Sequence, residues 1–314
     1  MPMSNAPGPA FVETKEYRRF QEFCEACQRD RYIGLCYGPS GVGKTLSARH
    51  YTDWDRVEPA DPYTSRGVFR PGEVPGNGSV LYTATVVNSP GQIERDIAGL
   101  RGKMSELVLQ RIRGEEEPRI AAARRKLEEE QAKHRIKGNR FAGKASQLRQ
   151  AETALSEVFR GDTERRREIG DPTRLILIDE ADRIKMAGLE QVRDIFDGGG
   201  IGLVLIGMPG LERRLTRYAQ LSSRVGFVHA FRSLGAAEVR TLLAGWRPPG
   251  VTLPEDLLAD PEGVATIIRV TGGNFRLIDR LLTQVGRILE LNGLGVVTRE
   301  VVEAAREVLV IGTA

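Results

Sequence analysis

The eight residues from Gly38 to Thr45 read Gly-Pro-Ser-Gly-Val-Gly-Lys-Thr and match the pattern G-x-x-x-x-G-K-[ST] at every fixed position. The flanks agree with this match, because residues 32–37 are apolar and predict a buried strand, and residues 45–51 predict a helix. On such a strand–loop–helix unit, backbone N–H groups and the helix N-terminus surround phosphate groups. The sequence therefore predicts a nucleoside triphosphate site.

Individual positions of this loop have expected roles. Lys44 should reach the β- and γ-phosphates, and the Thr45 hydroxyl should ligate Mg²⁺. The residues expected to bind the nucleotide are Gly38, Pro39, Ser40, Gly41, Val42, Gly43, Lys44, Thr45 and Leu46.

A second part of the site is predicted where residues 174–178 form an apolar strand that ends in Asp179 and Glu180. This is a Walker B pattern, in which Asp179 holds Mg²⁺ and Glu180 orients and polarises the attacking water. Open α/β sheets place their ligands at such strand ends. Asp179–Asp182 also spells the DEAD helicase motif, but helicases of that kind need a second strand-rich motor domain, and here the chain ends in helical segments.

Besides 32–37 and 174–178, three further segments predict strands, namely 79–87, 201–207 and 225–231. They are apolar without polar alternation and are separated by helical stretches, which is typical of a parallel sheet covered on both faces. From residue 232 onward only helices are expected, at 236–246, 264–271, 274–292 and 299–310. The expected organisation is a disordered tail (1–12), an α/β nucleotide-binding domain (13–232) and a helical lid (233–314).

Bulk properties restrict the class of protein further. Of the 314 residues, 40% are apolar and 28% are charged, as in ordinary soluble globular proteins. No apolar run approaches the length needed to span a bilayer, and the N-terminus lacks a secretory signal, so we expect a cytoplasmic protein. Cys24 and Cys27 form a C-x-x-C without a further ligand pair, which favours reduced thiols over a zinc site.

The span 115–167 differs in kind from the rest, because it is rich in Ala, Glu, Lys, Arg and Gln. It predicts long exposed helices inserted after a helix that runs from Pro90 to about Arg113, and Gly138-Asn139 or Gly143 would allow one helix to turn back on another as a hairpin. Between Arg119 and Arg149, ten Lys or Arg stand against three Glu, an excess above the net charge of +4 for the whole chain. Either a solvated helical face or contact with a DNA backbone would suit this excess.

The order of these motifs resembles that of the AAA+ ATPases over about residues 11–310. The resemblance implies a doubly wound parallel five-stranded sheet, a helical lid, and ATP with Mg²⁺ as ligands. Leu221-Ser-Ser-Arg-Val225 is similar to the arginine-finger box of that family, which makes Arg224 a catalytic residue acting in trans on a neighbouring subunit, with Arg213, Arg214 and Arg217 as nearby substitutes. Thr271-Gly-Gly-Asn-Phe-Arg276 is similar to the sensor 2 turn, which places Arg276 at the γ-phosphate.

One position departs from the family pattern. A polar residue usually follows the fourth strand and helps to position the attacking water, whereas this sequence has Met208, which cannot donate a strong hydrogen bond. Either the polar role is filled elsewhere or hydrolysis is slow.

Within the family, the leader at 14–20 and the G-x-P-G-L turn at 207–211 resemble the bacterial transposition-regulator branch, which includes Mu B, TnsC and TniB. That resemblance implies a homo-oligomer, as a ring or helical filament on duplex DNA, which recruits a transposase and so takes part in target-site selection. Two alternatives stay open: a remodelling or loader ATPase acting on a protein partner such as a replicative helicase, and a slow nucleotide-gated assembly switch.

Overall fold

One parallel sheet of five strands organises the first part of the chain. The computed structural model describes residues 11–61, 69, 75–137 and 170–309, with a few isolated positions between 149 and 167. The strand order is β2-β3-β4-β1-β5, and every pairing is parallel. The strands are β1 (Ile33–Tyr37), β2 (Ser79–Thr83), β3 (Leu175–Asp179), β4 (Gly202–Gly207) and β5 (Val225–Ala230). Their carboxyl ends therefore share one edge of the sheet, which is where α/β folds bind ligands.

The expected parallel α/β sheet is confirmed, with corrections at two strands. β3 and β4 are buried at every residue, as their unbroken apolar runs predict. β5, predicted as a buried strand, alternates between half-buried and exposed residues because it is an edge strand, and Val228 is 59% exposed. β2 ends at Thr83 rather than continuing to residue 87. The chain turns there, and the Asn88 side-chain amide donates to the Thr85 carbonyl at 2.7 Å.

Helices flank this sheet. The first, α1, begins after Thr14, whose hydroxyl accepts a hydrogen bond from the Tyr17 amide. It ends at Asp30 and is followed by Arg31, a C-cap residue in the left-handed region. Its buried face includes Phe20 and Cys24. The helices of this part are α1 (Lys15–Asp30), α2 (Lys44–Tyr51), α3 (Trp54–Val57), α4 (Pro90–Lys137), α6 (Met186–Asp197), α7 (Leu211–Thr216) and α8 (Ala219–Ser222), and the 3-10 turns are η1 (Pro75–Gly78) and η2 (Ala181–Arg183).

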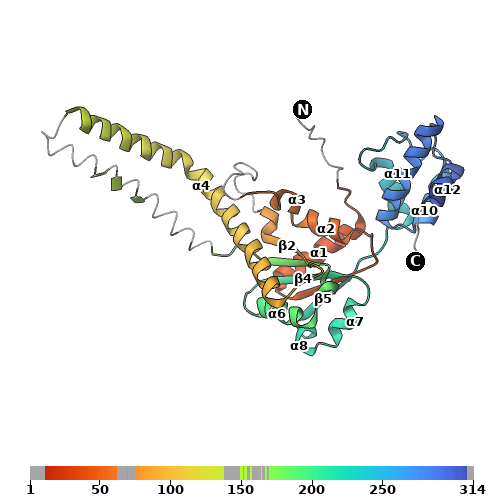
Figure 1. Ribbon diagram of the computed structural model, residues 1–314, viewed down its shortest axis with the longest axis horizontal. Coiled ribbons are helices and arrows are strands. Elements are labelled where there is room, and N and C mark those ends of the chain that lie inside the picture. The colour runs from red at the N-terminus through yellow and green to blue at the C-terminus, as the bar shows by residue number, and fades with distance from the viewer. Residues whose placement is uncertain are drawn as a thin grey trace.

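Helix α4 is much longer than the sequence predicted. Its first turns pack against β2 and α6 through buried Ile93, Ile97 and Met104, and the remainder extends away from the sheet (Figure 1). The expected end near Arg113 is wrong, because the helix continues through Gly114 and Pro118 to Lys137, and most of the residues around these two positions are strong helix formers. The charged insertion thus begins inside an existing helix, and its predicted hairpin turn lies outside the described residues.

The C-terminal part is helical, as predicted. Its helices are α9 (Ala236–Gly245), α10 (Pro261–Thr271), α11 (Phe275–Asn292) and α12 (Arg299–Glu307), and they form a separate group beside the sheet (Figure 1). They enclose their own apolar core, which begins with Leu234, whereas the core of the sheet domain ends with Phe231. A domain boundary between residues 232 and 233 stays a prediction that these two cores support.

The segment before α1 contacts both cores. Phe11 stacks on the His50 ring with 3.7 Å between ring centroids, and Val12 packs against the lid core. The backbone amide of Lys15 donates to Glu238 of α9 at 3.1 Å. The predicted disordered tail at 1–12 is therefore wrong at residues 11 and 12, because their apolar side chains pack against the two cores. Residues 1–10 lie outside the described part of the chain.

Candidate nucleotide-binding site

The P-loop connects β1 to α2 at the carboxyl edge of the sheet, as predicted. Two glycines are required by its conformation, since Gly41 and Gly43 have φ angles of 81° and 110°. Gly41 also has no room for a side chain, because a Cβ there would lie 2.6 Å from Asn274 Oδ1 and 2.8 Å from Arg276 Cβ. The lid thus contacts the loop directly.

Lys44 is buried at the start of α2. Its ammonium group donates to the carbonyl oxygens of Gly38 at 2.6 Å and Pro39 at 2.8 Å. Burial lowers the pKa of Lys44, and the negative charges of Asp179 and Glu180 oppose that change. The lysine is therefore a partly desolvated cation at the mouth of the loop, which suits an interaction with phosphate.

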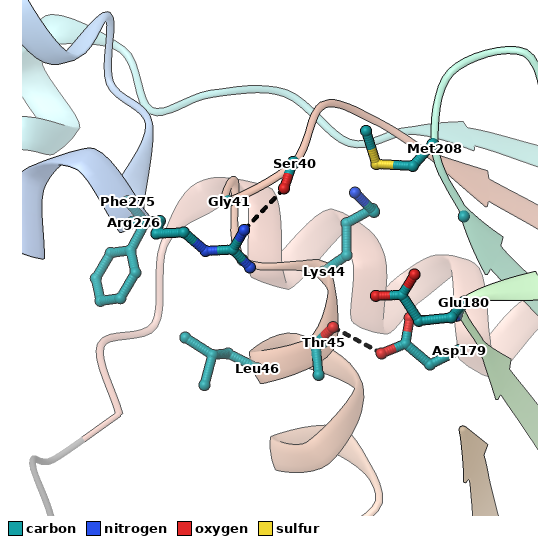
Figure 2. A pocket seen from close by; sticks show the side chains of 12 residues that line it. Ser40, Gly41, Lys44, Thr45, Leu46, Asp179, Glu180, Met208, Phe275 and Arg276 are labelled. Carbon is teal, nitrogen blue, oxygen red and sulfur yellow. Dashed lines mark hydrogen bonds between the residues drawn. The ribbon is translucent and has the colours of Figure 1, made fainter. Parts of the chain in front are cut away.

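Thr45 and Asp179 meet across the site. The Thr45 hydroxyl donates to Asp179 Oδ2 at 2.6 Å (Figure 2), although 134 positions separate the two residues in the chain. Asp179 is 2% exposed, and its other oxygen accepts from the Glu180 amide at 2.9 Å. Two oxygen ligands of the kind that Mg²⁺ prefers are therefore held next to each other by α2 and β3.

Glu180 occupies a strained turn. Its φ of 55° and ψ of 37° place it in the left-handed region, which costs a non-glycine residue on the order of 1 kcal/mol and is frequent at functional sites. Its carboxylate lies 3.6 Å from the Arg183 guanidinium, which also donates to the Ala84 carbonyl after β2. The carboxylate lines the same cleft as the P-loop.

The lid supplies a third group to the site. Arg276 Nη1 donates to the Ser40 hydroxyl at 2.8 Å (Figure 2). The Arg276 backbone amide donates to the Gly41 carbonyl at 3.0 Å. Asn274 caps α11 by accepting from the Leu277 amide, and its own amide donates to the Ser40 carbonyl at 2.7 Å. The Gly-Asn-x-Arg turn thus sets α11 against the P-loop.

These groups surround one cleft of about 540 Å³, part of which is open solvent. Gly38, Pro39 and Val42 do not line it, and Val42 instead packs in the core. Sequence reasoning did not assign Phe275 or Gly207 to the site, although both adjoin residues that it did single out. The lining residues are Ser40, Gly41, Gly43, Lys44, Thr45, Leu46, Asp179, Glu180, Gly207, Met208, Phe275 and Arg276.

Arg224 lies at the amino-terminal end of the strands, opposite the end that carries the cleft. It directly precedes β5, and its carbonyl accepts from the amide of Ile33 at the start of β1. Its guanidinium pairs with both carboxylate oxygens of Asp197, at 2.6 and 2.8 Å. It therefore does not join the cleft of its own chain. Among the substitutes, Arg214 is engaged with the carbonyls of Asp182 and Ile184.

Two other expectations concern cysteine and membrane. Cys24 and Cys27 are free and buried, and burial raises the pKa of Cys27 to about 12. Within the described ranges, no group of three or more His, Cys, Asp or Glu side chains could hold a metal ion. None of the described helices combines the length and apolar composition that crossing a bilayer requires.

The fold and the site define a P-loop nucleotide-binding protein with a helical lid. The sequence matches the AAA domain family over residues 27–215. It is 36% identical over 308 residues to the "Potential ATP-binding protein" of Staphylococcus aureus, which covers 96% of this chain and 97% of that one. The chain therefore belongs to the AAA+ family of P-loop ATPases.

More distant similarities agree with this assignment. The Mu-like prophage FluMu DNA transposition protein B of Haemophilus influenzae is 29% identical over 280 residues, 86% of this chain and 70% of that protein. The Thermotoga maritima RuvB Holliday junction branch migration motor has a TM-score of 0.51 at 14% identity, covering 96% of this chain and 71% of that one. The Aeropyrum pernix ORC1 protein in complex with DNA has a TM-score of 0.50 at 20% identity, covering 93% and 64%. The two solved structures support the fold alone.

Proposed function

We propose that this protein hydrolyses ATP and uses the nucleotide to assemble on duplex DNA as a regulator of a transposase. The observation that carries the ATPase part is the convergence of Thr45, Asp179, Glu180 and Arg276 on one cleft. A structural loop would not need acids from β3 and an arginine from the lid at the same place. The relationship to a DNA transposition protein B supports the second part.

The residues present fit Mg²⁺ as well as ATP. Mg²⁺ commonly takes one or two protein oxygen ligands together with waters and phosphates, and Thr45 and Asp179 offer such a pair. These two residues would hold the ion, which when bound would neutralise charge on the β- and γ-phosphates.

The protein's own residues then have separate tasks. Lys44 would bind the β- and γ-phosphates, for which it must exchange its bonds to the Gly38 and Pro39 carbonyls. Glu180 would orient and polarise the attacking water. Arg276, which already reaches Ser40, would contact the γ-phosphate and link the lid to the nucleotide.

The position of Arg224 supports an oligomer. The nucleotide cleft lies at the carboxyl ends of the strands and Arg224 at their amino ends, so an arginine finger at this position would act on the cleft of a neighbouring subunit. Such an arginine neutralises charge that develops in the transition state. In that arrangement Asp197 holds the side chain at the surface until the neighbour binds.

DNA contact is supported by charge. Arg124, Arg125 and Lys126 are exposed on the projecting part of α4, within the basic segment. If they bind phosphates, affinity for duplex DNA should fall steeply with added salt. The decisive experiment measures the ATPase rate with and without duplex DNA, together with electron microscopy in an ATP analogue. Stimulation and filaments or rings on DNA are expected, whereas a rate indifferent to DNA and particles that stay monomeric would refute the proposal.

A second candidate, a nucleotide-gated switch with slow turnover, is favoured by Met208. Its thioether lines the cleft where the family usually has a polar side chain. Single-turnover kinetics separate the two candidates. Assembly that persists long after ATP addition, with turnover on the scale of minutes or slower, would identify a switch.

A further inference from the structure

The turn after β4, residues 207–210, is held from both sides. The Gly38 amide of the P-loop donates to the Gly207 carbonyl at 3.3 Å. On the other side, the Met208 amide donates to Asp182 Oδ1 at 3.1 Å. Because β4 lies between β1 and β3, these two bonds tie the turn to both nucleotide-binding motifs.

The carboxylate of Asp182 lies directly over the end of β4. A Cβ at Gly207 would be 2.8 Å from Asp182 Oδ1 and 2.7 Å from a methyl group of Leu211, so a larger residue than glycine does not fit there. The close approach leaves little freedom in the distance between the carboxylate and the turn. Asp182 is half-buried, and it is not among the residues that line the cleft.

Asp182 is itself fixed in place. It belongs to the 3-10 turn η2, which begins directly after Glu180, and the Arg183 amide closes this turn on the Glu180 carbonyl at 2.9 Å. Arg214 of α7 donates one bond to the Asp182 carbonyl at 2.8 Å and another to the Ile184 carbonyl. Glu180 and Asp182 therefore move as parts of one short, restrained turn.

We propose that Asp182 is a positioning residue for hydrolysis, which uses its bond to the Met208 amide to set the 207–210 turn relative to Glu180. The inference rests on the proposed function, ATP hydrolysis at this cleft. Met208 lines the cleft but its side chain cannot donate a hydrogen bond. The turn therefore shapes the space beside Glu180 through its backbone, and Asp182 supplies the restraint that a polar side chain at position 208 would otherwise give.

Two substitutions at Asp182 separate the hydrogen bond from the charge. Asp182→Ala removes the acceptor, while Asp182→Asn keeps an oxygen that can accept from the Met208 amide. In the full-length protein, Asp182→Ala should lower kcat for ATP hydrolysis at least tenfold with the Kd for ATP within twofold of wild type. Asp182→Asn should keep most of the wild-type kcat.

Either of two results would overturn this proposal. One is a wild-type kcat in Asp182→Ala. The other is a loss of kcat in Asp182→Asn as large as that in Asp182→Ala. If Asp182→Ala does not fold, Arg214→Gln replaces it, with the exposed Thr216→Ala on the same helix as control, and a wild-type kcat in Arg214→Gln then refutes the proposal. A wild-type protein that binds ATP without hydrolysing it would overturn the proposed function as well. Hydrolysis unaffected by Asp182→Ala overturns only this inference.

Discussion

Arg276 of the lid donates a hydrogen bond to Ser40 of the P-loop, so a guanidinium reaches a residue 236 positions earlier in the chain. Two neighbouring hydrogen bonds hold the same part of the lid against the P-loop. The Asn274 side-chain amide donates to the Ser40 carbonyl, and the Arg276 backbone amide donates to the Gly41 carbonyl. The orientation of the lid and the shape of the phosphate loop are therefore set together.

Arg276→Ala should impair hydrolysis more than binding. The guanidinium would stabilise charge on the γ-phosphate, and removing one such group typically lowers kcat on the order of 100-fold. Steady-state ATPase assays and titration with a fluorescent ATP analogue measure the two effects. Arg280→Ala, exposed one turn later on α11, is the matched control and should behave as wild type. Equal activity in both variants would remove Arg276 from the site.

Glu180→Gln should bind ATP and yet fail to turn it over, because an amide cannot polarise water as a carboxylate does. The protein should then accumulate in its assembled form, which size-exclusion chromatography with light scattering detects in ATP. Glu262→Gln, at the start of α10, serves as control. Undiminished turnover in Glu180→Gln would assign the catalytic role to another residue.

Arg224→Ala should lose most of its ATPase activity while a single subunit still binds ATP, since in the proposed oligomer the arginine acts on the neighbour. Lys44→Ala should lose nucleotide binding because its P-loop has no cation. Mixed together, the two variants should regain part of the wild-type rate, because an intact cleft can then meet an intact arginine. A mixture that stays as inactive as its components argues against an arginine shared between subunits.

His229 makes stability depend on pH. Burial among Phe20, Phe23 and Phe231, together with nearby positive charges, lowers the pKa of His229 from 6.5 to about 4, even though Glu16 lies 3.4 Å away. The unfolded chain takes up a proton below pH 6.5 that the folded chain takes up only near pH 4. The folded state therefore loses stability as pH falls from about 6.5 towards 4.

Denaturant unfolding at pH 7 and pH 5 measures this loss. His229→Leu should show a smaller decrease in the free energy of unfolding between the two pH values than wild type does. The same decrease in both proteins would mean that other groups carry the pH dependence.

Much of the site could be predicted because its chemistry is local in sequence. The P-loop, Asp179-Glu180 and Asn274-Phe-Arg276 are short motifs whose residues act within a few positions of each other. Apolar runs without alternation predicted the parallel sheet. The predicted burial of β5 was wrong, because the sequence does not indicate which strand lies at the edge of the sheet. Helix α4 was cut short in the prediction because the change to a charged composition looked like an element boundary.

The contacts that sequence reasoning missed are long-range ones. Nothing near Asp182 indicates that its carboxylate accepts from the Met208 amide, 26 positions away. Likewise, the pairing of Arg224 with Asp197 depends on how α6 and α8 pack against each other. Such partners are determined by the folded arrangement, since each side chain alone is compatible with many neighbours.

The long helix α4 has a mechanical consequence. Its 48 residues extend roughly 70 Å at 1.5 Å per residue, and its first turn follows the loop that joins it to β2. The part beyond Leu109, the last residue of α4 that the structure describes as buried, is roughly 40 Å long, so a tilt of about 5° at its base displaces its tip by roughly 4 Å. A small change in the tilt of α4 beside β2 would thus move the charged end much farther than the base. A force applied to the charged end would likewise act on the base of the helix.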